Sequence, residues 1–206
     1  MVTRIGLVCH RYPPYTGGLE RHVFDVAQGL VSRGFHVKVF STSSNERRSG
    51  GESMVEMRVI QLPAGGYYFW PGFLSPPVLR ELDEIDVFHS FSATMFPPIA
   101  ALSWARLKRV PSVLTATYHP IEFTPHVFPR YLYDHLVMGH VVRGYDRIIL
   151  HSEVETTSLM QTVGNLRSAR IMKIEHSSGI LRVKPEALDL RDRIGRPGVH
   201  MILCVG

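Results

Sequence analysis

The sequence has few of the features that define several large classes of protein. It contains only two cysteines, Cys9 and Cys204, each in an apolar strand-like run, and no Cys-x-x-Cys pair. This pattern excludes a disulfide-stapled scaffold and a cysteine-based zinc site, so both thiols are expected to be reduced core residues. No run reaches about 18 consecutive apolar residues, and the N-terminus does not read as a signal peptide. A cytoplasmic protein is therefore expected, with work at the inner face of a membrane left open.

Charge and metal-ligand spacing exclude two further classes. The net charge is +5, but the lysines and arginines are dispersed and do not alternate with aromatic residues. Nucleic acid is therefore not an expected partner, whereas the positive balance suits a phosphate-bearing ligand or an anionic membrane surface. No cluster of His, Asp and Glu has the spacing of a metal site, so no metal cofactor is expected.

The clearest organisation lies in residues 4–39. A short apolar run ending at Cys9 is typical of a strand buried on both faces, and residues 19–30 show apolar positions at helical spacing. The loop between them contains Gly17 and Gly18, which we expect to take φ > 0 where needed and to let a ligand approach the backbone. In open α/β sheets this is a ligand-binding position, and a helix start offers N–H groups to an anion. A simple tight turn is the alternative.

The segment from Tyr12 to His22, Tyr-Pro-Pro-x-x-Gly-Gly-Leu-Glu-Arg-His, resembles the opening of glycosyltransferase family 4. These are retaining, nucleotide-sugar-dependent enzymes of the two-domain GT-B fold, and Gly17, Gly18, Glu20 and His22 fall at the family's spacing. The resemblance implies a Rossmann-like, mostly parallel sheet with helices on both faces. It also implies a nucleotide-sugar donor, with the Gly17–Gly18 loop near its phosphates or the acceptor, and Tyr12 stacking on or hydrogen-bonding the acceptor.

Two later strands, at residues 85–89 and 112–117, end in polar residues at the same edge of the expected sheet. The resemblance implies that His119 hydrogen-bonds the donor sugar and orients it at the reacting centre, without acting as a general base. A satisfied structural histidine is the alternative. His89, followed by Ser90, matches the first histidine of a His-x-His pattern, whose second position is here Phe91.

Two further segments match the family in part. Ser152 and Glu153 correspond to its Ser-Glu pair, although Ser152 also reads as the N-cap of a capping box, Ser-x-x-Glu, that opens a helix ending at Gly164. Near the donor the family shows a hinge, Asn-Gly-Val-Asp. Gly179 and the residue after it keep the central part, but Ser and Leu replace the flanking Asn and Asp.

The remaining elements are placed by their patterns. We expect a polar loop at 41–53, an edge or antiparallel strand at 54–62, helices at 78–84, 94–107 and 128–144, and strands at 147–151 and 170–175. The aromatic segment 64–77 has two interpretations: a loop folded over the core, or an exposed apolar surface for a lipid acceptor and peripheral membrane contact.

The expected domain organisation is asymmetric. Residues 1–181 read as the N-terminal, acceptor-binding domain, 182–198 as an interdomain linker, and 199–206 as the first strand of a truncated nucleotide-sugar-binding domain. We therefore expect the chain alone to be inactive and to self-associate through the surface left uncovered. The acceptor class, a lipid or a glycan, stays open. A non-catalytic binding module is the alternative, and a dinucleotide-dependent oxidoreductase or epimerase is disfavoured because G-x-G-x-x-G is lacking.

Overall fold

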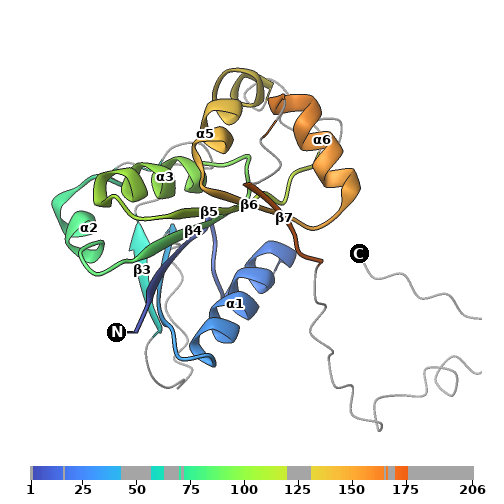
Figure 1. Ribbon diagram of the computed structural model, residues 1–206. Coiled ribbons are helices and arrows are strands. Elements are labelled where there is room, and N and C mark those ends of the chain that lie inside the picture. Colours follow the sequence, from blue (N-terminus) through green and yellow to red (C-terminus); the bar gives the residue numbers. More distant parts are fainter. Residues whose placement is uncertain are drawn as a thin grey trace, which may run out of the picture. The chain divides into compact units, whose positions relative to one another are not determined.

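The computed structural model describes residues 2–15, 17–42, 57–62, 70, 72–119, 131–164, 166 and 170–175. Their strands form one sheet in the order β3-β2-β1-β4-β5-β6-β7, and every neighbouring pair is parallel (Figure 1). The predicted fold class, a Rossmann-like α/β sheet, is confirmed. The strands are β1 (Arg4–Val8), β2 (His36–Thr42), β3 (Met57–Leu62), β4 (Val87–Phe91), β5 (Ser112–Thr115), β6 (Arg147–Leu150) and β7 (Ile171–Lys173).

Helices cover both faces of this sheet. Helix α1 (Gly18–Val31) lies on one face and buries Val23 and Ala27 against β1 and β2. The opposite face carries α2 (Pro76–Glu81), α3 (Pro97–Lys108), the π-helical turn η2 (Asp134–Met138), α5 (Gly139–Gly144) and α6 (Glu153–Val163) (Figure 1). The strand order reverses between β1 and β4, which makes their carboxyl ends the topological switch point at which open α/β sheets bind ligands.

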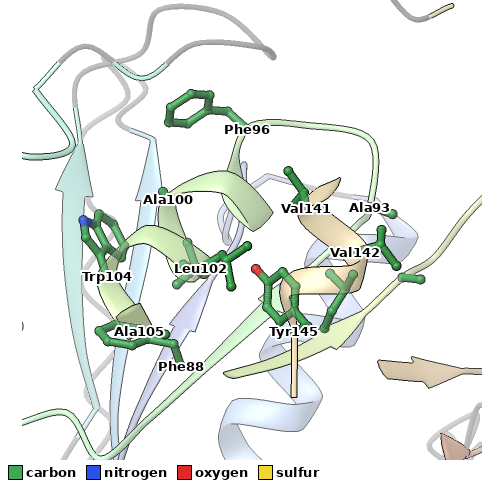
Figure 2. Packing of buried hydrophobic residues seen from close by; sticks show 14 of the residues in the cluster. Phe88, Ala93, Phe96, Ala100, Leu102, Trp104, Ala105, Val141, Val142 and Tyr145 are labelled. Atoms are coloured by element: carbon green, nitrogen blue, oxygen red, sulfur yellow. The ribbon is translucent and has the colours of Figure 1, made fainter. Parts of the chain in front are cut away.

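The larger core lies beneath α3. Figure 2 shows Trp104 and Leu102 of α3 beside Phe88 of β4, with Tyr145 approaching from the end of α5. Trp104 is fully buried, its ring centroid lies 5.1 Å from that of Phe40, and its Nε1–H donates to the Phe73 carbonyl at 2.9 Å. The buried Tyr145 hydroxyl donates to the Pro98 carbonyl at 2.6 Å, so the Trp104 and Tyr145 side chains both have a hydrogen-bond partner inside this core.

Several predicted boundaries change. β3 is an edge strand as expected, but it pairs parallel to β2 and not antiparallel. Helices α2 and α3 begin at Pro76 and Pro97, because proline is favoured in a first turn, where its missing N–H costs no hydrogen bond. Helix α6 ends at Gly164 as predicted, with φ +76°.

Some predictions fall on residues outside the described ranges: most of the 41–53 loop, Gly179, the linker 182–198, the strand 199–206 and Cys204. Of the aromatic segment 64–77, Trp70 is fully buried and Phe73 packs edge-on against Phe96 at 5.1 Å, so these residues belong to the core. No helix in the part of the chain that the structure describes has the length and apolar character needed to cross a bilayer.

Two glycine substitutions are expected to change stability in opposite directions. A Cβ on Gly6 in β1 would lie 2.9 Å from the buried Phe88 ring, so Gly6→Ala should lower the free energy of unfolding by about 1–3 kcal/mol through overpacking. A Cβ on Gly29 in α1 would meet only the flexible Arg33 guanidinium at 3.3 Å, so Gly29→Ala should raise it by about 0.5–1 kcal/mol. Urea denaturation of both variants measures the difference, and equal effects would contradict it.

Candidate functional site

The carboxyl ends of β4 and β5 hold two residues in the left-handed backbone region. Ser92, directly after β4, has φ +72°, and Thr117, shortly after β5, has φ +44°. For a β-branched residue such as threonine this conformation is an outlier, and outliers of this kind gather at ligand-binding and catalytic positions. The backbone itself therefore marks this edge of the sheet.

A cavity of about 360 Å³ opens beside Thr117. Three short segments form its wall: residues 117–119, which follow β5; His151, which follows β6; and the first turns of α6 with its N-cap. It therefore brings together His119 and Ser152, two of the predicted site residues. The lining residues are Thr117, Tyr118, His119, His151, Ser152, Val154, Glu155 and Ser158.

The start of α6 departs from the predicted capping box in one respect. The Ser152 hydroxyl accepts the Glu155 N–H at 3.1 Å, which confirms the N-cap. The Glu155 carboxylate, however, does not close the box on Ser152. It accepts the His151 N–H at 2.7 Å and the Tyr118 N–H at 2.8 Å. The capping-box pattern predicts Glu155 only as a helix cap, and no pattern in the sequence indicates a role for His151 or Ser158.

Aromatic rings connect α1 to the cavity. His22, in the first turns of α1, lies edge-on to His151 with ring centroids 5.3 Å apart, and edge-on to Phe91 at 5.7 Å. His89 stacks on Phe91 at 4.4 Å. The first turns of α1 and the His119 cavity therefore share one edge of the sheet. Phe91, in place of the second histidine of the His-x-His pattern, is fully buried between these rings.

His89 is a neutral residue at pH 7. Its Nε2 lies 2.8 Å from the Thr115 hydroxyl, and burial together with the neighbouring His22 lowers the pKa of its imidazole to about 3. At neutral pH it therefore supplies no positive charge, and it is not among the residues that line the cavity. In the part of the chain that the structure describes, no group of three or more His, Cys, Asp or Glu side chains is arranged to hold a metal.

The glycine loop behaves differently from the prediction. Gly17 is the extended N-cap of α1, with φ −172° and ψ 163°, and positive φ occurs at neither Gly17 nor Gly18. A Cβ on Gly17 would instead run into the Glu20 carboxylate, which folds back over it, while nothing lies within 4 Å of a Cβ on Gly18. Neither glycine is therefore required for a left-handed backbone, and a side chain at position 17 would only displace the end of the flexible Glu20 side chain.

Three other predicted site residues lie away from the cavity. Tyr12 is only 7 % exposed and packs against Phe24 of α1. Ser90 is fully buried on the α3 face of β4, beside the Tyr145 phenol. The Glu153 side chain is 77 % exposed and pairs with Lys173 at 2.9 Å. The cysteine of this edge, Cys9, is a buried free thiol whose pKa burial raises to about 12, as expected for a core residue.

The low pKa of His89 predicts acid sensitivity. Because the folded state binds this proton more weakly than the unfolded state, stability is complete above the unfolded pKa near 6.5 and falls as the pH drops toward 3. Between pH 7 and pH 5 we expect a loss of about 1–2 kcal/mol from this residue. His10, whose pKa burial lowers to about 4, adds to the same slope. Urea titrations of wild type and His89→Asn at both pH values test this, and an unchanged slope in the variant would contradict it.

Comparison with known proteins identifies the family to which the chain is similar. The model of Glycosyltransferase Family 4 matches residues 16–175, and no match is found among curated proteins. UGT89C1 from Arabidopsis thaliana, complexed with UDP-L-rhamnose, is 13 % identical, with a TM-score of 0.53 over 84 % of this chain and 48 % of that chain. UDP-GlcNAc 2-epimerase from Methanocaldococcus jannaschii is 10 % identical, with a TM-score of 0.48 over 84 % and 45 %.

At 13 % identity UGT89C1 supports the fold alone, and the chain spans about half the length of each of these two proteins. The family model carries the assignment, because its match runs from the loop before α1 to just past β7 and includes every lining residue of the cavity. The chain belongs to glycosyltransferase family 4.

Proposed function

We propose that this chain is the N-terminal, acceptor-side domain of a retaining glycosyltransferase, which moves a hexosyl group from a nucleotide-sugar to an acceptor hydroxyl. The observation that supports this most is the cavity at the carboxyl ends of β5 and β6, with His119 exposed in its wall and the switch point beside it. A family assignment alone would not say which part of the domain works. The cavity supports a location at the carboxyl ends of β5 and β6.

The cavity residues suit the sugar better than the diphosphate. None of the described lining residues is Lys or Arg, while hydroxyls and imidazoles are frequent among them. His119 would hydrogen-bond the sugar and orient it, and Ser152 would add a hydroxyl at the rim. The negative charge of the leaving diphosphate would be balanced elsewhere, by the N–H groups at the start of α1 and by a second domain.

In this reaction the acceptor hydroxyl attacks the anomeric carbon on the face from which the diphosphate leaves. The new glycosidic bond forms as the bond to the diphosphate oxygen breaks, and the acceptor proton passes to the departing phosphate. The domain contributes positioning of the two reactants and the exclusion of water from the cavity. Without a second domain to complete the cleft, the chain alone would not transfer sugar.

The test uses the full-length protein. It is incubated with several nucleotide-sugars and with lipid and soluble glycan acceptors, and the anomeric configuration of any product is read by NMR. Transfer with retained configuration supports the proposal, and transfer with inversion overturns the retaining mechanism. Specific binding of a donor or acceptor with no transfer in any combination would support the alternative, a non-catalytic module. Phe91 in the His-x-His position favours that alternative.

The same proposal extends to the acceptor, the cellular location and contact with a membrane. A lipid or glycan acceptor, a cytoplasmic location and peripheral membrane contact fit an enzyme that glycosylates at a membrane surface. Tyr131, Leu132 and Leu136 are 50 %, 49 % and 61 % exposed along one stretch before α5. Apolar side chains of this kind support contact with another surface, by self-association or at a membrane.

A further inference from the structure

We propose that Glu155 is a positioning residue for His119, acting through Tyr118. The inference rests on the proposed function, because it assigns work to the His119 imidazole. The Glu155 carboxylate joins the ends of two strands: one oxygen accepts the Tyr118 N–H at 2.8 Å, and the other accepts the His151 N–H at 2.7 Å. A single side chain thereby fixes the spacing between the two walls of the cavity.

The Tyr118 side chain is held by the same helix. Its hydroxyl lies 2.9 Å from the Thr162 hydroxyl and 3.5 Å from the Asp134 carboxylate. Glu155 and Thr162 are seven residues apart and therefore share one face of α6. Tyr118, 4 % exposed, is thus gripped by α6 at its backbone and at its ring. Asp134 belongs to η2, a π-helical turn of the kind that is frequent at functional sites.

These contacts of Tyr118 with α6 explain the strained backbone of the preceding residue, Thr117. Thr117, with φ +44°, immediately precedes Tyr118, and such a conformation persists only where the surroundings over-determine it. His119 follows directly, with its Cα about 3.8 Å from that of Tyr118. A change in the Tyr118 backbone would therefore swing the His119 imidazole in the cavity. A mere helix cap would need only the Ser152 hydroxyl, which already receives the Glu155 N–H.

The test compares Glu155→Gln with a matched control in the full-length protein. Glutamine keeps the volume but offers one acceptor oxygen, so it leaves one of the two N–H groups facing an NH₂ donor. We expect kcat for transfer to fall about a hundredfold with a smaller change in KM, as for a misplacement of about 1 Å. Glu84→Gln, on an exposed turn after α2, should change neither.

A second readout follows the imidazole itself. The NMR signals of the His119 ring, assigned by their loss in His119→Gln, should shift in Glu155→Gln and stay unchanged in Glu84→Gln. Thr162→Val removes the hydroxyl that holds the Tyr118 ring and should move the same signals, whereas Thr157→Val, on the exposed face of α6, should not. If Glu155→Gln does not fold, Thr162→Val carries both readouts.

The outcomes separate the two proposals. Unmoved His119 signals and an unchanged kcat in the folded variants would overturn the positioning role. A wild-type protein that transfers no sugar would overturn the proposed function. In that case the His119 signals alone still decide whether Glu155 sets the position of the ring.

Discussion

Replacing Trp104 with alanine is expected to lower the free energy of unfolding by about 3–5 kcal/mol. Trp104 is fully buried in the core beneath α3 (Figure 2), and its ring centroid lies 5.1 Å from that of Phe40 and 5.9 Å from that of Phe88. Alanine would leave a cavity lined by these aromatic rings. It would also remove the hydrogen bond from Nε1–H to the partly buried Phe73 carbonyl.

Denaturation in urea, followed by circular dichroism, measures this loss. Leu107→Ala on the same helix is the matched control: Leu107 is 57 % exposed, so its truncation should stay within about 0.5 kcal/mol. Trp104→Phe keeps most of the ring volume and loses only the hydrogen bond and part of the contact, so it should fall between the two. A loss below about 1 kcal/mol for Trp104→Ala would mean that the helix does not depend on this anchor.

The sheet could be predicted from the sequence because its strands are buried on both faces. Their apolar runs stand out against the polar turns, and the alternation with helices implies parallel pairing. For residues 54–62 the sequence left two alternatives, an edge strand or an antiparallel strand, and β3 is the edge strand, paired parallel to β2. The apolar pattern of one strand does not show whether it runs parallel or antiparallel to its neighbour, because the path of the connection between the two strands decides its direction.

Within the site, the sequence identified the edge but not all of its side chains. His89 and Ser90 are adjacent, and successive side chains of a strand point to opposite faces, so only one of the two could reach the edge on the α1 side. This alternation of side chains along a strand could have been used to choose between His89 and Ser90 from the sequence alone. The two hydrogen bonds that the Glu155 carboxylate accepts could not be predicted from the sequence. Their donors are the N–H groups of Tyr118 and His151, which come together only when β5 and β6 pair.

Replacing His119 with alanine is expected to lower kcat/KM for sugar transfer by about a hundredfold to a thousandfold, through the loss of a hydrogen bond that orients the donor. The side chain is exposed in the cavity wall, so the fold should keep its stability to within about 0.5 kcal/mol. The combination of a large kinetic effect and a small stability effect is what separates a ligand-binding histidine from a structural one. His140→Ala is the matched control, since His140 is an exposed histidine on α5 outside the cavity.

Initial rates with the best donor and acceptor, measured beside urea denaturation, give both quantities. His119→Gln should recover part of the rate, because its amide can donate a hydrogen bond into the same space. If the ring orients the sugar and does not take a proton, the rate lost on substitution should vary little with pH. A loss that appears only above the pKa of an imidazole would indicate proton transfer instead, and equal rates for His119→Ala and His140→Ala would remove His119 from the site altogether.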